Sequence, residues 1–398
     1  MSRAHGMAGT PVPDRSRRGP GALVVAAFVL LSLNLRIVFG GVGPLIPNLQ
    51  LSHTATTALT TLPPLCMGLF APVAASLRGR LGDERSLFAA MAVLVIGILI
   101  RSSGTTGLFV GTVVASIGVA VMNVITPVLV KKRFPPERIG VMMGVYAMMM
   151  GGGAAVIAAL TVPIFRASGG SASTALGVAV VPAVVALAAL TTQLRHGPDR
   201  SRGGSVSWTG LLANRIAWST TCFFGLQSLM LYTVFAWLPT IYVSNGADPA
   251  TAGVYLSLCV IAVSLGGFFG PSLAGRRADQ RPYVLLTAAL CFVGIAGVLW
   301  APLSSAPVWS VVLGIGLGAG QGIPGVLYVA RARDRQTAAA LSGMAQTIGY
   351  VIAATGPILT AALFAASGTW TMPLVLLLVL LVLNAVVSLP AGRPGTVD

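Results

Sequence analysis

Acidic residues are scarce in this chain, where 9 Asp and Glu stand against 25 Lys and Arg in 398 residues. All of them fall in tails or in polar segments between apolar runs: Asp14, Asp83, Glu84, Glu137, Asp199, Asp248, Asp279, Asp334 and Asp398. A membrane-embedded enzyme would need clustered carboxylates, histidines or nucleophiles. The distribution therefore argues against an enzyme, and it leaves no intramembrane carboxylate of the kind that carries protons in ion-driven pumps.

Histidine and cysteine are also rare, with 3 His and 4 Cys. The cysteines all lie in apolar runs, and their spacing matches no metal or redox motif, so we interpret them as small packing residues: Cys66, Cys222, Cys259 and Cys291. There is no Walker motif for ATP. The sequence thus predicts neither a metal site nor a cofactor nor catalytic residues.

Long apolar runs dominate what is present. Hydrophobic residues make up 55% of the chain and charged residues 9%, against about 25% charged in soluble domains. A helix needs about 20 residues to cross a bilayer, and the sequence contains twelve such windows: 21–48, 55–77, 86–102, 107–130, 139–165, 172–194, 214–243, 250–274, 282–302, 307–330, 336–366 and 370–390. We therefore predict an all-α, multi-pass membrane protein with twelve transmembrane helices.

The positions of the basic residues predict the orientation. With the amino terminus inside, 22 of the 25 Lys and Arg lie in inside segments, as the positive-inside rule requires for both termini in the cytoplasm. Arg101 and Arg166 then lie at outer span ends, and Arg36 alone is buried. The net charge of +16 reports this topology in the plasma (inner) membrane rather than binding to nucleic acid.

An internal repeat divides the chain into two halves. The loop at Arg80 recurs at Arg276 with an offset of 196 positions, and Gly144 recurs at Gly343 with an offset of 199. Matching offsets at corresponding spans indicate two pseudo-symmetric six-helix bundles, an arrangement found in transporters. We expect a tail over 1–20, bundles over 21–194 and 214–390, a cytoplasmic linker over 195–213 and a tail over 391–398.

The same segments carry a family resemblance. Leu33-Asn34-Leu35-Arg36 with Val42 to Pro47, the run from Asn123 to Pro135, and Leu341 to Gln346 ahead of Gly349-Tyr350 resemble the CynX/NimT (cyanate/2-nitroimidazole transporter-like) branch of the major facilitator superfamily. The resemblance covers all twelve spans and implies a central cavity between the bundles and alternating access. The degenerate superfamily loop signature implies gating roles for six residues: Arg80, Asp83, Arg85, Arg276, Asp279 and Arg281.

Arg36 is the leading candidate for the substrate site. It lies about 15 residues into its span, or roughly 22 Å at about 1.5 Å per residue. If the helix is tilted, this position is near the midplane of the roughly 30 Å hydrocarbon core of the bilayer. A guanidinium stays charged and offers five donors in a planar fork that suits carboxylate, nitro or cyanate-like groups. The alternatives are a structural tie to Asn34 or to backbone carbonyls, or a different depth in the membrane.

Neutral polar residues complete the expected substrate site. The resemblance implies that helices 1, 4, 7 and 10 line the cavity, which favours Gln227 and Gln321 over the remaining candidates: Asn34, Asn123, Tyr146, Tyr232, Gln346 and Tyr350. Interhelical hydrogen bonds are an equally open interpretation of each glutamine.

We expect this chain to be a monomeric secondary transporter in the lipid bilayer that moves a small anionic or electron-rich polar solute. Proton symport, anion exchange and simple facilitation all remain open as its coupling. The main alternative is efflux of neutral nitro-aromatic or drug-like compounds by the same fold, with Arg36 structural. A sensor or scaffold with a transporter fold is a further alternative.

Overall fold

The computed structural model describes residues 22–45, 49, 51, 53–194 and 208–397. The predicted tail over 1–20 and most of the predicted linker lie outside these residues. The described chain is helical, with a single isolated β-bridge between Ala332 and Val397. The first group of helices comprises α1 (Ala22–Gly40), α2 (Val42–Leu45), α3 (His53–Leu81), α4 (Asp83–Arg101), α5 (Gly104–Arg133), α6 (Pro136–Ala167), α7 (Ala172–Gly177) and α8 (Val180–Thr191).

The second group follows a short 3-10 helix, η3 (Trp208–Ala213). It comprises α9 (Arg215–Ser244), α10 (Pro249–Ala274), α11 (Arg281–Trp300), η4 (Leu303–Ser305), α12 (Ala306–Ala330), α13 (Arg335–Ser367) and α14 (Thr371–Gly392). Each of the twelve predicted windows corresponds to one helix or to one broken pair, such as α1 with α2 and α7 with α8. The predicted all-α architecture is therefore confirmed.

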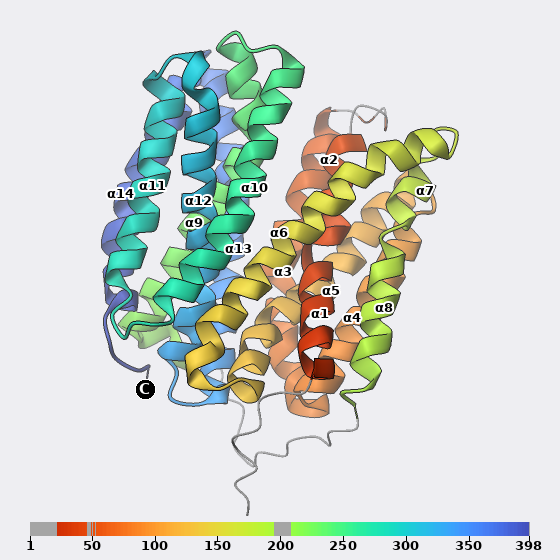
Figure 1. Ribbon diagram of the computed structural model, residues 1–398, viewed down its shortest axis with the longest axis vertical. Coiled ribbons are helices and arrows are strands. Elements are labelled where there is room, and N and C mark those ends of the chain that lie inside the picture. The colour runs from red at the N-terminus through yellow and green to blue at the C-terminus, as the bar shows by residue number, and fades with distance from the viewer. Residues whose placement is uncertain (1–21, 46–48, 50, 52, 195–207, 398) are drawn as a thin grey trace, which may run out of the picture.

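The two groups stand side by side, with α6 next to α10 (Figure 1). α3 and α13 form the other long contact between them. α1 begins and α14 ends at the same end of the molecule (Figure 1), which we call the tail end. One large buried hydrophobic cluster lies mostly in the first group and extends to Phe224 and Tyr350 of the second, and another lies within the second group.

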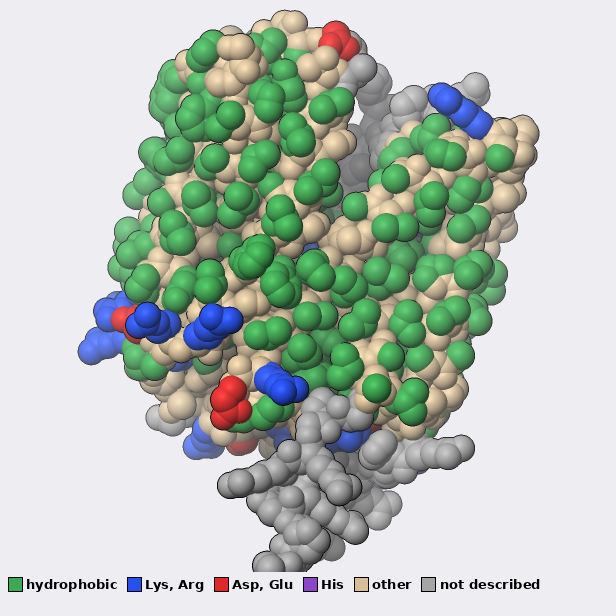
Figure 2. Space-filling view, in the orientation of Figure 1, with side chains coloured by type: hydrophobic (Ala, Val, Ile, Leu, Met, Phe, Trp, Pro, Cys, Tyr) green, Lys and Arg blue, Asp and Glu red, His purple; other side chains and the backbone are tan. Residues whose placement is uncertain are grey.

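Ten of the described spans are long and apolar enough to cross a membrane. The remaining two are α3, which begins with a threonine-rich segment, and α4, which begins with Asp83, Glu84 and Arg85. Hydrophobic side chains cover the long sides of the molecule, whereas Lys and Arg gather toward the tail end (Figure 2). An apolar belt with a charged end is the surface that a bilayer requires.

Glycines allow the helices to pack closely. A Cβ atom at Gly318 of α12 would overlap the carbonyl oxygen of Val263 in α10. Between the groups, a Cβ at Gly140 of α6 would lie 2.9 Å from the Cα of Gly275, just beyond α10. Small residues let backbones approach in this way because lipid provides no hydrophobic drive for helix association.

We expect Gly318→Ala to lower the stability of the protein by about 1–3 kcal/mol, because the added methyl forces α12 away from α10. Gly152→Ala is the matched control. Gly152 lies inside α6 with nothing within 4 Å of the added Cβ, so this variant should be neutral or slightly stabilising. Thermal unfolding in detergent measures both, and equal melting temperatures would contradict the close crossing.

Candidate functional site

A cavity of about 130 Å³ lies between the two helix groups. Its wall is largely apolar and aromatic, with a few polar side chains from both groups. The polar lining residues are Arg36 of α1, Asn123 of α5, Tyr146 of α6, Gln321 and Tyr328 of α12, and Gln346 and Tyr350 of α13. A mostly apolar pocket with a few convergent polar groups is the usual form of a small-molecule site.

Arg36 reaches across the boundary between the groups. Its Nη1 donates a hydrogen bond to the Tyr232 hydroxyl of α9 at 2.5 Å, and its Cζ lies 5.4 Å from the centroid of the Tyr232 ring. This distance is within the range of a cation–π contact. Within the described ranges no acidic residue forms an ion pair with Arg36, so its charge is balanced only by aromatic and polar neighbours.

A hydrogen-bond network centred on Asn123 forms another part of the cavity wall. The Asn123 side-chain oxygen accepts from the Tyr146 hydroxyl at 2.9 Å, and its nitrogen donates to the Tyr350 hydroxyl at 3.4 Å. Gln346 Nε2 donates to the Asn123 backbone carbonyl at 2.9 Å. These contacts join α5 and α6 of the first group to α13 of the second.

Aromatic rings from the second group extend this wall. Phe224 of α9 lies edge-on to Tyr350, with centroids 5.1 Å apart, and 6.5 Å from Tyr328. Tyr328 is absent from the residues that the sequence predicted. The signal was available, because Tyr328 follows Gln321 by seven residues, which is two turns along the same helix face.

Two of the predicted site residues lie away from the cavity. Asn34 donates to the carbonyls of Leu30 and Pro182 at 2.8 and 3.1 Å, and so it ties α1 to α8. It stands two residues before Arg36, which places it on the opposite face of the helix. Gln227 is fully buried inside the second group, where it donates to the Gly316 carbonyl at 3.3 Å. Gln227 thus makes the interhelical contact that was its alternative interpretation, and the second contact of Asn34 is interhelical as well.

Gln321 lines the cavity and is paired with a neighbour in α9. Its Nε2 donates to Ser228 Oγ at 3.1 Å. The structure therefore brings together Arg36 and six of the other predicted residues around one cavity, Tyr232 through its contact with Arg36: Asn123, Tyr146, Tyr232, Gln321, Gln346 and Tyr350.

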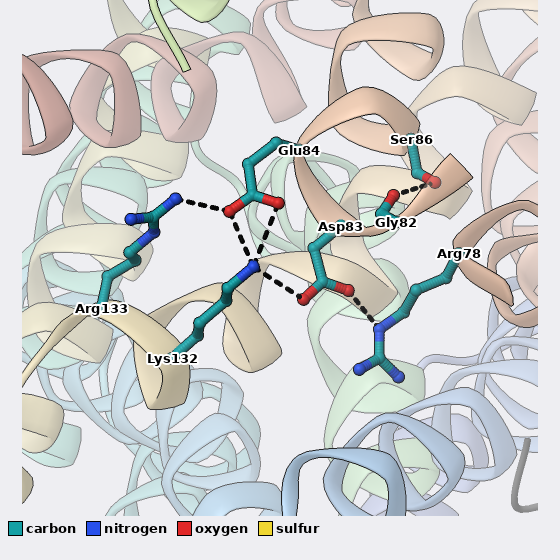
Figure 3. Close-up of polar contacts among 7 residues, drawn as sticks. All are labelled: Arg78, Gly82, Asp83, Glu84, Ser86, Lys132 and Arg133. Atoms are coloured by element: carbon teal, nitrogen blue, oxygen red, sulfur yellow. Dashed lines mark hydrogen bonds and ion pairs between the residues drawn. The ribbon is translucent and has the colours of Figure 1, made fainter. Parts of the chain in front are cut away.

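A charge cluster lies at the tail end of the first group (Figure 3). Glu84 accepts from Lys132 Nζ at 2.9 Å and from Arg133 Nη2 at 2.6 Å. Asp83 pairs with Arg78 and lies 3.9 Å from Lys132. Both carboxylates are at least nine-tenths buried, so the cluster fixes the start of α4 against the end of α5.

The predicted gating residues divide between this cluster and the surface. Asp83 belongs to the cluster, whereas Arg80 and Arg85 are exposed. Glu84, Lys132 and Arg133 were not predicted, because their pairing depends on the contact between α4 and α5. Arg78 of α3, which pairs with Asp83 five residues further on, was not predicted either.

The basic residues around the loop between α10 and α11 have different partners from those of the first group. Asp279 and Arg281 form a largely exposed ion pair at 2.7 Å, and Arg276 is exposed. The hydrogen bonds from Arg281 lower the pKa of Asp279 to about 2. Arg331, 3% exposed, donates to the Gln280 side chain and to the Ala391 carbonyl at 2.7 Å. Neutral acceptors thus replace the carboxylates of the first group.

Two further cations were not recognised from the sequence. Lys131 of α5 donates to the carbonyls of Val329 and Ala332 at 3.1 and 2.6 Å, so it ties the two groups together at the tail end. Arg101 was expected at an outer span end, with Arg36 as the buried arginine. Arg101 is indeed the last residue of α4, but Arg36 as the only buried arginine was wrong, because Arg101 is 2% exposed and donates to the Val38 carbonyl of α1.

Comparison of the sequence with known proteins identifies its family. Residues 24–354 match the Major Facilitator Superfamily. The chain is 35% identical to the 2-nitroimidazole transporter of Escherichia coli (strain K12) over 379 residues, which cover 93% of this chain and 95% of that protein. It is 28% identical to the cyanate transport protein CynX of the same organism over 357 residues, or 88% and 92% of the two chains.

The fold resembles solved structures whose sequences are distant. The E. coli fucose:proton symporter superposes with a TM-score of 0.68 at 15% identity, covering 92% of this chain and 98% of that one. At this identity the likeness shows the fold alone.

We expect Glu84→Gln to destabilise the protein by about 2 kcal/mol, because it leaves Lys132 and Arg133 partly buried with one carboxylate fewer. Asp279→Asn removes a carboxylate from the exposed pair and should leave the melting temperature unchanged, since solvent screens such pairs. Thermal unfolding of the two variants beside the wild type separates these cases. Equal melting temperatures would show that the buried cluster contributes nothing.

Proposed function

Because this chain belongs to the major facilitator superfamily, a family of transporters, we propose that it moves a small anionic or electron-rich polar solute across the membrane by alternating access. The observation that carries the proposal is Arg36, a cation that faces the cavity between the bundles without a described carboxylate partner. The family and the named relatives are transporters, and this protein is not an enzyme.

The chemistry of Arg36 favours an electron-rich solute. A planar fork of five donors binds two oxygen or nitrogen acceptors at once, and among the described residues Arg36 donates one hydrogen bond, to Tyr232. Cyanate, nitro and carboxylate groups all supply such acceptors. The two solutes that appear in the names of the relatives, 2-nitroimidazole and cyanate, would both meet this requirement. Rings such as those of Phe224 and Tyr350 would stack on a planar solute.

Alternating access requires contacts that open and close at the two ends. At the tail end, Lys131 links the groups, while the Asp83–Glu84 cluster holds the first bundle. We propose that this end is cytoplasmic in the cell membrane, because the basic residues gather there, and that α1–α8 and α9–α14 move as the two halves. The Lys131 contacts would have to break in the inward-facing state.

No carboxylate lines the cavity among the described residues. If protons are cotransported, they therefore travel with the solute or bind to a group other than a carboxylate of this cavity. Exchange of one anion for another and facilitated transport fit the same geometry, and we propose a monomer as the transporting unit.

A second candidate function follows from the apolar character of the cavity wall. Met143, Met150, Phe224 and Phe235 line it together with the tyrosines, and such a surface also accepts neutral nitro-aromatic or drug-like compounds. In that case the protein is an exporter and Arg36 is structural, held by Tyr232.

We expect Arg36→Ala to weaken binding of the transported anion by at least about tenfold, because a charge-assisted hydrogen bond is lost. Arg36→Lys should also fail, since an ammonium lacks the planar fork. The measurement is the melting-temperature shift of purified protein with cyanate, nitrate, small carboxylates and 2-nitroimidazole, followed by uptake into proteoliposomes.

Arg166→Ala is the matched control, because it removes an exposed arginine at the end of α6. It should behave as the wild type. Shifts that come only from neutral aromatic compounds, and that persist in Arg36→Ala, would contradict anion transport and favour export of those compounds.

A further inference from the structure

The side-chain amide of Gln346 is held in one orientation on the cavity wall. Its Nε2 donates to the Asn123 backbone carbonyl at 2.9 Å and to Ser342 Oγ at 3.0 Å. The Asn123 carbonyl can only accept, so the nitrogen must face it, and the amide cannot be turned round without losing this bond. The orientation of the Gln346 oxygen is therefore fixed.

The Gln346 oxygen has no hydrogen-bond partner among the described residues, although the residue is only 4% exposed. The hydroxyl of Tyr328, 3% exposed and on the same cavity, also lacks a partner. Buried polar groups are nearly always paired, and an unpaired one is costly to the folded state. Two unpaired groups on one wall indicate that this wall is incomplete without a solute.

The other side-chain amides of the cavity are paired through both their oxygen and their nitrogen. Gln321 and Ser228 bond to each other through both the oxygen and the nitrogen of the glutamine. Asn123 accepts from Tyr146 and donates to Tyr350. Gln346 is thus the amide on this wall whose acceptor is left open.

We propose that Gln346 determines specificity by accepting a hydrogen bond from the solute, so that the preferred cargo carries an N–H or O–H donor as well as the electron-rich group that Arg36 receives. The inference rests on the proposed function and narrows it. Ring N–H heterocycles and hydroxy-substituted acids meet both requirements, whereas bare cyanate and nitrate lack the donor. Because the oxygen is enclosed in this state, the bond forms as the wall adjusts around the solute and so favours the closed, loaded carrier.

Two nitro compounds of equal ring size test the requirement. 2-Nitropyrrole and 2-nitrofuran present the same nitro group, and only the pyrrole carries an N–H donor. We expect the wild-type protein to bind 2-nitropyrrole about tenfold more tightly, as one additional hydrogen bond provides. Calorimetric titration of the purified full chain gives both affinities, and the comparison needs no variant.

Gln346→Leu should bring the two affinities together by weakening the pyrrole alone. Gln321→Leu is the matched control, because Gln321 lies on the same cavity with its amide already paired. It should keep the tenfold preference even if both affinities fall. If Gln346→Leu does not fold, equal binding of the two compounds by the wild type still overturns the role of Gln346.

The outcomes separate the inference from the proposed function. Equal binding of the two compounds by the wild type would overturn the role of Gln346 while leaving anion recognition by Arg36 standing. Binding of cyanate that depends on Arg36, with no binding of 2-nitropyrrole, would overturn it as well. If no solute binds in a manner that depends on Arg36, the proposed function fails and the inference fails with it.

Discussion

A permanently charged guanidinium among apolar helices is the constraint on which this structure depends. At bilayer depth it costs at least about 2.5–3.5 kcal/mol, and in most proteins a carboxylate would offset this cost. Here Arg36 contacts the hydroxyl and lies within cation–π range of the ring of Tyr232 across the boundary between the bundles. No described carboxylate neutralises this charge, so we expect the cavity to keep an electrostatic preference that an internal ion pair would remove.

The surrounding scaffold keeps the cavity small and its polar groups fixed. Asn123 connects α5, α6 and α13, so three helices share one hydrogen-bond centre. Glycines on α6, α10 and α12 bring backbones close enough that little space remains outside the cavity. Such packing transmits motion between helices because it deforms little. Arg36 and Gln346 both donate hydrogen bonds across the boundary between the bundles, so we expect a change at either residue to alter the contacts between them.

The number and the approximate limits of the helices could be predicted because each span is a local property of about 20 residues. That Arg36 lies within the first span followed from the same arithmetic. The face of the helix on which a polar residue lies was harder to predict. Asn34 was grouped with Arg36 because they are neighbours in sequence, yet a step of two residues on a helix reverses direction. Gln227 and Gln321 were both favoured, and that only Gln321 lines the cavity depends on helix rotation, which tertiary packing sets.

The charges at the tail end illustrate the other limit of the sequence. Glu84 and Arg133 stand 49 positions apart, and nothing local connects them. Arg101 stands at the end of α4, as the sequence indicates, but its burial is set by the close packing of α4 on α5, where Gly111 leaves room beside it. Long-range contacts of this kind follow from the assembled fold and not from any one segment.

The two repeats secure their tail ends by different physical means. The first uses ion pairs around Glu84, and the second uses Arg331 with backbone carbonyls and the Gln280 amide. Dissolved salt screens exposed charge pairs over about 8 Å at physiological strength, but it acts far less on buried pairs and on hydrogen bonds to neutral acceptors. The Glu84 pairs are buried and the acceptors of Arg331 are neutral, so both halves keep their tail-end contacts when the ionic strength changes.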